Sequence, residues 1–467
     1  MKIARQLDAN GTVDLAEEPK TSSNLNKDSM NFHEDNLTLV QNLRQSSDLP
    51  LFSTSKFPIN SSVSQSKDRD MARKIGIEGL YYITHCDNVP SILKWGILSH
   101  DLVQKKGIKY AQIYNSNIVN NRSQKTIEGK SLWEFANLYF QPRNAMLYSL
   151  KEKKNEIAII CIKRDILKKH NAYIATGNAA SRESKIFSIQ EGRCYLPKIR
   201  DEIDKDWWKV EDGSKRKMMA EFLVPDFVSP KYIQGIYVAS DKAREKLEQV
   251  IIKSEYSDLL NVPISVEPKR FFQPDWKGSL TSTLFLIRGD MFFSTMQTLT
   301  ISVNCVGVMG KGLASTAKYR FPDLYVKYQD ICKSNLLKMG QPYLYKREAS
   351  IAQQLADEAL LSEQEYYSQT WFLLFPTKNH WKNKADLLGI EKGLQWLLEN
   401  YKRLNIESLA MPALGCGLGE LEWRDVGPLM CKYLSAMRIP TAIYLPVNKE
   451  VPQEFLSQEF LLSKIDF

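Results

Sequence analysis

The chain has 467 residues, which is too long for one ordinary core, and at about 150 residues per domain it predicts two or three compact units. Hydrophobic residues make up 43% of it and charged residues 25%, which is typical of a globular protein that buries substantial cores. The chain has no apolar run of about 18 residues and no secretory signal at its N-terminus, so we expect a cytoplasmic protein outside the membrane.

The cysteines and the charges narrow the classes further. The seven cysteines are scattered, with no CxxC pair and no histidine at metal-ligand spacing, so we expect reduced thiols and no metal site. The net charge of +9 divides into −2 for residues 1–70, +10 for residues 71–283 and +1 for residues 284–467. A basic middle region fits a partner that carries phosphates, such as a nucleic acid, although a merely soluble basic surface explains the charge equally well.

Residues 1–70 are rich in Ser, Asn and Gln and poor in aromatic residues, so we expect a disordered N-terminal arm. Order is expected from about residue 77. Apolar residues 80–84 and 156–162 and the run 232–239 predict strands, residues 89–96 predict a helix that ends at Gly96, and residues 241–252 predict another helix. Residues 177–218 show little periodicity, and we expect a functional or mobile loop there.

Residues 273–282 are expected to be a linker, because the prolines before residue 275 interrupt the periodicity and a new pattern follows. From residue 283 to residue 467 strands and helices alternate. Strands are expected in TLFLI (283–287), TLTISV (298–303), WFLLF (371–375), SLAMPAL (408–414) and TAIYLP (441–446), and helices in residues 386–401 and 426–437. This alternation predicts an α/β domain with a central sheet that is covered on both faces.

Two glycine-rich loops follow strands in this second domain. Glycines 307, 310 and 312 lie in the first loop, and glycines 415, 417 and 419 lie in the second. Glycine at a strand end lets backbone amides approach phosphate oxygens closely, although a single loop of this kind is as often a plain tight turn. The chain has neither the P-loop spacing nor the GxGxxG fingerprint, which weakens ATPase and dehydrogenase interpretations.

The segments IRGDMF, SVNCVGVMGKGLA, FPTKNHW and PALGCGLGELEW resemble the motifs of a macrodomain, and those of its DarG branch in particular, over residues 283–447. The resemblance implies a three-layer α/β fold that binds ADP-ribose. By it, Asp290 holds the adenine amino group, Asn304 faces the distal ribose, and Lys378 removes ADP-ribose from DNA. The two loops would wrap the diphosphate and ribose through Gly307, Gly310, Gly312, Gly415, Cys416, Gly417, Leu418 and Gly419.

The residues alone favour a plainer role for Lys378, since a lysine at a strand end is usually a solvated surface group. A lysine amine can nevertheless attack an anomeric carbon or move a proton. In the first domain the unusual residue is Glu221, which precedes the apolar run FLVP, where an unpaired carboxylate would cost several kcal/mol. A carboxylate in such a place needs a partner or a chemical task.

The segments YYITHCDNVPSILKWGILS, NNRSQ, LYFQPRNAMLY and MAEFLVPDFVSP resemble, in order, the motifs of the DarT family of DNA ADP-ribosyltransferases over residues 77–272. The resemblance implies an α+β ADP-ribosyltransferase fold in residues 71–272 and NAD as the substrate. By it, Glu221 is the catalytic glutamate, and Arg122 contacts NAD and the incoming base. Thr84, His85 and Asn88 would line the NAD pocket, and Tyr139, Arg143 and Asn144 would contact single-stranded DNA.

Together the two resemblances imply a fused toxin and antitoxin. The first domain would transfer ADP-ribose from NAD to a base of single-stranded DNA, commonly thymine, and the macrodomain would remove it, with contact between the two domains. Electrostatic stabilisation of the ribose cation and an unpaired acceptor base are the chemical requirements for transfer. Two alternatives stay open: a macrodomain that only binds ADP-ribose, and an acceptor that is guanine, RNA or protein.

Overall fold

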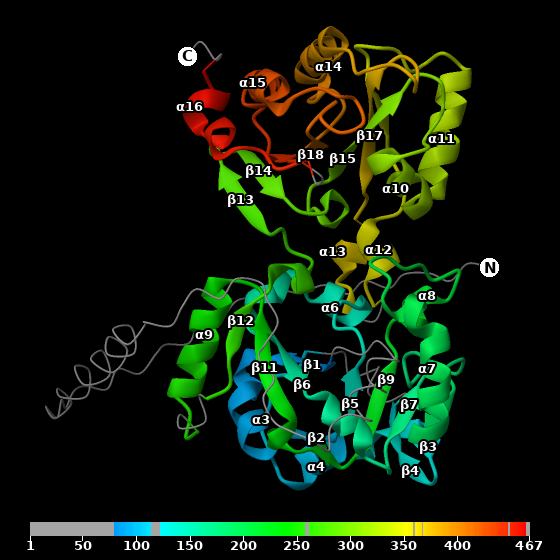
Figure 1. Ribbon diagram of the computed structural model, residues 1–467, viewed down its shortest axis with the longest axis vertical. Coiled ribbons are helices and arrows are strands. Elements are labelled where there is room, and N and C mark those ends of the chain that lie inside the picture. Colours follow the sequence, from blue (N-terminus) through cyan, green and yellow to red (C-terminus); the bar gives the residue numbers. More distant parts are fainter. Residues whose placement is uncertain are drawn as a thin grey trace, which may run out of the picture. The chain divides into compact units, whose positions relative to one another are not determined.

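The computed structural model describes residues 79–113, 122–256, 261–357, 360–366, 368–446 and 449–463 (Figure 1). The expected arm, residues 1–70, lies outside them. The first domain is built on an eight-stranded sheet with the order β12-β11-β6-β1-β5-β9-β7-β8. Its strands are β1 (Leu80–His85), β5 (Phe135–Tyr139), β6 (Ile157–Ile162), β7 (Tyr173–Ala175), β8 (Ile186–Ser188), β9 (Glu221–Pro225), β11 (Ile233–Val238) and β12 (Ile264–Val266).

The central position of β6 in this sheet agrees with its apolar composition. All six residues of β6, IAIICI, are buried, as expected for a strand that is covered on both faces, and β6 pairs in antiparallel fashion with β1 and β11. Helix α3 (Val89–Trp95) ends where Gly96 adopts φ +85°, and a Cβ on Gly96 would lie 2.1 Å from the Val228 carbonyl oxygen. Glycine is therefore required at that helix end.

The expectation of an irregular segment over residues 177–218 is wrong for much of its length. Residues Ile189–Ile203 form α7, which begins at the Ser188 cap and contains both Gly192 and Pro197. Gly192 lets the helix pack on β7, because a Cβ there would lie 2.7 Å from Cβ of Ile174. Packing thus overrides two poor helix formers. The first domain also contains the helices α4 (His100–Lys105), α6 (Ala145–Ser149), α8 (Ser214–Lys217) and α9 (Asp241–Ile252).

The second domain is a seven-stranded sheet with the order β13-β14-β19-β18-β15-β17-β16, whose inner pairs are parallel. Helices cover the sheet, as expected for an α/β domain (Figure 1). The strands are β13 (Trp276–Ser279), β14 (Leu284–Arg288), β15 (Thr298–Asn304), β16 (Tyr343–Tyr345), β17 (Trp371–Lys378), β18 (Leu409–Pro412) and β19 (Thr441–Tyr444). The helices are α10 (Gly312–Arg320), α11 (Pro322–Lys333), α12 (Ile351–Leu355), α13 (Glu363–Tyr366), α14 (Leu387–Asn400), α15 (Trp423–Leu434) and α16 (Gln458–Leu461).

The expected linker, residues 273–282, contains an element of this second sheet. Residues 276–279 form β13, which pairs in antiparallel fashion with β14 and places Trp276 opposite Arg288. A short edge strand of this kind carries little apolar signal, because only one side of it is packed. Because β12 ends at Val266 and β13 begins at Trp276, only a short segment separates the sheets of the two domains along the chain.

The two domains share a core of aromatic side chains, which confirms the expected contact between them. Trp207 of the first domain packs against Phe292 and Phe293 of the second, with ring centroids 6.4 Å and 5.6 Å apart. The Trp208 indole N–H also donates to the Leu355 carbonyl at 2.9 Å. Apolar burial and a buried hydrogen bond together argue for a stable contact.

Candidate active sites

Glu221 is held by three hydrogen bonds at the start of β9. Arg122 donates from Nη1 to Oε2 at 3.0 Å and to Oε1 at 3.3 Å, and the Ala179 amide donates to Oε1 at 2.7 Å. The Glu221 side chain is 1% exposed. The ion pair and the amide therefore compensate the cost of burying this carboxylate, which answers the question raised by its place beside FLVP.

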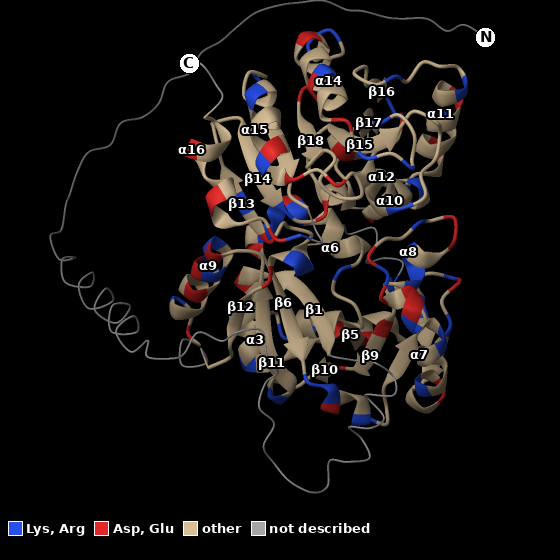
Figure 2. Ribbon diagram, turned by 45° about the horizontal axis from the view of Figure 1, so that its top comes forward, with Lys and Arg blue, Asp and Glu red and all other residues tan. Residues whose placement is uncertain are grey.

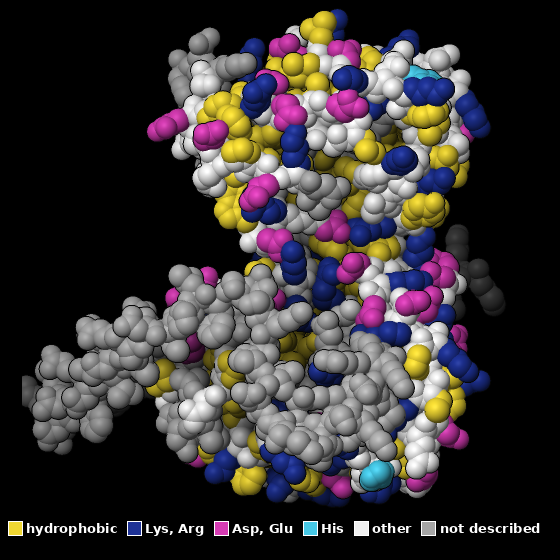
Figure 3. Space-filling model, in the orientation of Figure 1, with side chains coloured by type: hydrophobic (Ala, Val, Ile, Leu, Met, Phe, Trp, Pro, Cys, Tyr) yellow, Lys and Arg dark blue, Asp and Glu magenta, His cyan; other side chains and the backbone are white. Residues whose placement is uncertain are grey.

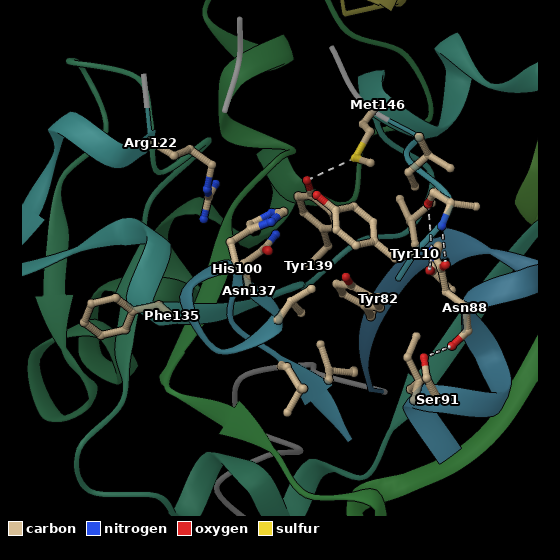
Figure 4. Close-up of a pocket in the computed structure, with 18 of the residues that line it drawn as sticks. Tyr82, Asn88, Ser91, His100, Tyr110, Arg122, Phe135, Asn137, Tyr139 and Met146 are labelled. Atoms are coloured by element: carbon tan, nitrogen blue, oxygen red, sulfur yellow. Dashed lines mark hydrogen bonds between the residues drawn. The ribbon is translucent and has the colours of Figure 1, made fainter. Parts of the chain in front are cut away.

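Arg122 uses only half of its guanidinium for this pair. Its Nη2 atom is buried and has no hydrogen-bond partner among the described residues. Arg122 lies on the wall of a cavity, and its guanidinium points inward toward His100 (Figure 4). A buried donor without a partner is costly, so this nitrogen is suited to a ligand that brings an acceptor.

The cavity that Arg122 borders has a volume of about 150 Å³. Among the side chains that line it are Tyr82, Tyr110, Asn137, Tyr139 and Met146 (Figure 4). Burial raises the pKa of Tyr82 to about 12, so its phenol stays protonated at neutral pH. Aromatic walls with a few polar groups are typical of a site for a planar organic ligand.

The predicted NAD-pocket residues divide into two that reach the cavity and one that does not line it. Thr84 and Asn88 line it. Asn88 also fixes a cavity wall, because its amide accepts from the Ala111 N–H at 2.7 Å and donates to the Ala111 carbonyl at 2.9 Å. His85 is not among the lining residues; its Nδ1 accepts from the Asp87 amide, and its Nε2 lies 3.6 Å from Glu156.

His100 and Lys125 were missed in the sequence. Burial, aided by the charge of Arg122, lowers the pKa of His100 to about 4, so the imidazole on the cavity wall is neutral at pH 7. The Lys125 ammonium donates to the carbonyls of Ala179 at 2.7 Å and Ser181 at 2.8 Å. Lys125 thereby fixes the loop whose Ala179 amide binds Glu221, and no sequence signal marks it among the other lysines of a basic domain.

The side chains predicted to contact DNA are largely buried. Tyr139 is 6% exposed and donates to the Met146 sulfur at 3.4 Å inside the cavity. Arg143 pairs with Asp206 at 2.7 Å and stacks on Phe272 and Phe293 at the contact between the domains.

Asn144 is fully buried and caps α6, where its Oδ1 accepts from the Leu147 amide at 3.0 Å. The structure therefore gives Asn144 a task inside the protein, and its contact with DNA stays a prediction.

In the second domain, Asp290 lies just after β14, as expected for a residue at the carboxyl edge of the sheet. Its Oδ1 accepts from the Phe292 amide at 3.0 Å, and its Oδ2 accepts from Arg320 at 2.8 Å. Asp290 is 37% exposed and borders a cavity that Arg143 and Tyr444 also line. A ligand amino group would have to share Oδ2 with Arg320 or displace it.

Asn304 ends β15 and organises the first glycine-rich loop. Its Oδ1 accepts from the Val306 amide at 3.0 Å and from the Tyr328 hydroxyl at 2.9 Å, and its Nδ2 donates to the Val308 carbonyl at 2.6 Å. Both ends of the amide are therefore occupied within the protein. That Asn304 faces the distal ribose stays a prediction, and in this conformation its amide groups bind the loop.

The two glycine-rich loops lie side by side, which the sequence could not show. A Cβ on Gly312 would lie 3.2 Å from Cδ1 of Leu418, which is 62% exposed. Gly307, Gly312 and Gly415 have φ of +79°, +62° and +73°, so glycine is needed at each.

The first loop leads into the N-terminus of α10, where backbone amides favour an anion. In the second loop, a Cβ on Gly419 would lie 2.5 Å from the Gly415 carbonyl, while Gly310 and Gly417 have free space around them. Burial raises the pKa of the Cys416 thiol to about 12, so it stays protonated.

Lys378 ends β17 next to these loops. It stands opposite Asn304 in the parallel pairing of β15 and β17, and its ammonium donates to the Leu418 carbonyl at 3.0 Å. The predicted catalytic lysine, the Asn304 loop and the second glycine-rich loop therefore meet at one edge of the sheet. The carboxyl ends of parallel strands are where α/β folds bind ligands.

Within the part of the chain that the structure describes, no three His, Cys, Asp or Glu residues come together as metal ligands. A search of the same residues finds no helix with the length and apolarity needed to span a membrane.

These two folds and their sites define a class of protein, namely a transferase domain joined to a macrodomain. A family model described as "ssDNA thymidine ADP-ribosyltransferase, DarT" matches residues 81–272, and one described as "Macro domain" matches residues 302–430. A DNA ADP-ribosyl transferase-DNA ADP-ribosyl glycohydrolase fusion protein of Thermosipho africanus is 52% identical over 388 residues, which cover 82% of this chain and 98% of the relative. The chain therefore belongs to the family of fused DarT and DarG proteins.

Two further comparisons agree. The solved structure of Thermosipho africanus DarTG in complex with ADP-ribose has a TM-score of 0.75 and 50% identity, and covers 82% of this chain and 99% of that chain. A DNA ADP-ribosyl glycohydrolase of Mycobacterium tuberculosis is 33% identical over 159 residues, which make up 34% of this chain and 41% of the relative. The resemblances to DarT and to the DarG macrodomain are confirmed.

Proposed function

We propose that residues 79–272 transfer ADP-ribose from NAD to a thymine of single-stranded DNA and that the macrodomain removes it, so that one chain carries a toxin and its antitoxin. The observation that carries the transfer is the ion pair between Glu221 and Arg122 on the cavity wall, because the buried Nη2 atom of Arg122 has no hydrogen-bond partner among the described residues. Such a nitrogen suits a phosphate or a carbonyl of the substrates.

Transfer breaks the bond between nicotinamide and the anomeric carbon, and a ring nitrogen of the base forms the new bond and loses its proton. Positive charge develops on the ribose as nicotinamide leaves. The Glu221 carboxylate, fixed by Ala179 and Arg122, stabilises this charge. The positive charge of Arg122 offsets the negative charge of the diphosphate and of the deprotonated base. The base has to be unpaired, because its edge must reach the anomeric carbon.

Removal breaks the bond between the base nitrogen and the anomeric carbon. Water adds at the anomeric carbon, and the base nitrogen regains a proton. The loop at Gly307–Gly312 and the loop at Gly415–Gly419 bind the diphosphate and ribose through backbone amides. Lys378 acts on the scissile bond, and the hydrogen bond of its ammonium to the Leu418 carbonyl of the second loop supports this role. Asp290 binds the adenine amino group in exchange for part of its pair with Arg320.

The proposal is tested with a thymine-containing single-stranded oligonucleotide, NAD and the full chain with Lys378→Ala, so that product accumulates. Mass spectrometry is expected to find one ADP-ribose on the oligonucleotide and none on a thymine-free oligonucleotide of equal length. Product on RNA, on protein or on the thymine-free control instead would move the acceptor elsewhere. Wild-type chain added later is expected to return the oligonucleotide to its unmodified mass.

A further inference from the structure

A macrodomain segment between β16 and β17 reaches the transferase domain. We call residues 350–357, which include α12, together with residues 360 and 361 the bridging segment. It lies against α6 (Figure 1). The Asp357 amide donates to the Ser149 hydroxyl at 2.9 Å and to the Ala145 carbonyl at 3.3 Å, and the Trp208 indole donates to the Leu355 carbonyl. Both ends of α6 are therefore bound to backbone groups of the macrodomain.

The bridging segment also borders the cavity of the transferase site. Asp357 and Leu360 are among the residues that line the cavity that contains Arg122 and Tyr139. On the transferase side, α6 supplies Met146, whose sulfur accepts from the Tyr139 hydroxyl. Asp357 is one of the charges that add to the raised pKa of Tyr139, after burial and Glu221, which places its carboxylate near that hydroxyl.

We propose that Leu360 of the macrodomain is a specificity-determining residue of the transferase and that the bridging segment forms one wall of its NAD site. The inference rests on the proposed function in one respect, that the occupant of the cavity is NAD. An apolar wall at Leu360 excludes water and limits the room for the ligand, and the bonds of Asp357 keep α6 and Met146 in place. NAD binding by the transferase domain thereby depends on the folded macrodomain of the same chain.

The test compares Leu360→Trp with Leu388→Trp in the full chain. Leu388 is 61% exposed on α14 and lies outside the cavity, so its variant controls for an added indole. An indole in a cavity of about 150 Å³ is expected to raise the KM for NAD about tenfold or more, and the cavity left by Leu360→Ala should raise it several-fold. Removal of ADP-ribose from a modified oligonucleotide is the readout that the macrodomain stays folded.

Unchanged KM values for both Leu360 variants would overturn the proposal. If Leu360→Trp also impairs removal, the Leu360→Ala variant decides: a raised KM supports the proposal, and an unchanged KM overturns it. Binding of carba-NAD, an analogue that cannot transfer its ADP-ribose, is measured by calorimetry for the same variants. If the wild-type chain modifies no DNA, the proposed function fails, whereas weaker carba-NAD binding by Leu360→Trp than by Leu388→Trp still supports the inference.

Discussion

The carboxylate of Glu221 is buried and accepts three hydrogen bonds, two from Arg122 Nη1 and one from the Ala179 amide. Glu221→Gln keeps its shape and removes the charge that stabilises the ribose cation, so transfer should slow about a hundredfold or more. Single-turnover modification of an oligonucleotide measures this. Glu183→Gln serves as the matched control, because Glu183 is exposed and pairs with Arg216. Equal rates for the Glu221→Gln variant and the wild type would remove Glu221 from the mechanism.

His100 provides a test of the electrostatics of the site. Its pKa is lowered to about 4 in the folded chain by burial and by Arg122, against about 6.5 when unfolded. The unfolded chain therefore binds a proton first as the pH falls, and the folded chain loses up to about 3 kcal/mol of stability between pH 6.5 and pH 4.

NMR titration of His100 should give a midpoint near 4, and His100→Asn should make acid unfolding less steep. A midpoint near 6.5 would mean that the imidazole is not buried beside Arg122.

Some of these roles could be predicted from the sequence and others could not. Glu221 is conspicuous because a charge beside an apolar run needs a partner. Asn304 and Asn144 carry the right residue types in the right motifs, yet their amides are bound by loop and helix-end atoms nearby. A polar side chain can form its hydrogen bonds either with nearby backbone atoms or with a ligand. The backbone conformation decides between the two, and this conformation cannot be read from the residue pattern.

At the scale of elements, the loop between β7 and β8 depends on Lys125, which holds the carbonyls of Ala179 and Ser181. Lys125→Met removes two charge-assisted hydrogen bonds and frees the Ala179 amide that orients Glu221. We expect about a tenfold loss of kcat for transfer, since misplacement of a catalytic group by a fraction of an ångström has effects of this size.

The comparison variant is Lys130→Met, whose side chain is exposed on β4 (Lys130–Ser131). If both variants transferred ADP-ribose equally fast, the positioning role of Lys125 would be disproved.

The regular elements were predictable where local pattern and burial agree. Strands β6 and β17 contain apolar runs, β15 alternates apolar residues with Thr and Ser, and α9 and α14 have helical periodicity. Helix α7 and strand β13 were missed for physical reasons: α7 relies on a glycine that lets it pack on β7, and β13 is a short edge strand with half-exposed residues. Tertiary packing decides both cases.

At the scale of the whole molecule, net charge is divided unevenly along the chain. Residues 71–283 carry a net charge of +10, and the other two regions together contribute −1 to the total of +9. Basic and acidic side chains nevertheless alternate over α7 and α9, and on the face drawn in Figure 3 they alternate along the edge near α7 and α8 (Figures 2 and 3). Long-range attraction of DNA is therefore a property of the domain's net charge, and selection of the base falls to the cavity around Arg122.

Fusion of the transferase domain with the macrodomain has a consequence for the cell. One chain fixes the ratio of the two domains at one to one and keeps the macrodomain near the transferase domain, at roughly millimolar effective concentration. An unopposed transferase would consume NAD and block replication templates, so the fused chain is tolerated only while removal keeps pace with transfer.

Lys378→Ala in the full chain should therefore accumulate ADP-ribosylated DNA and stop growth on expression. Adding Glu221→Gln should restore growth, because no modification is made, and Lys382→Ala, in the loop just after β17, is the matched control. Growth curves and mass spectrometry of genomic DNA measure both effects. A toxic double variant would show that toxicity comes from something other than transfer. A harmless Lys378→Ala chain whose DNA is unmodified, while transfer is active in vitro, would show that removal does not need Lys378, since its ammonium would then serve only to tie β17 to the Leu418 carbonyl.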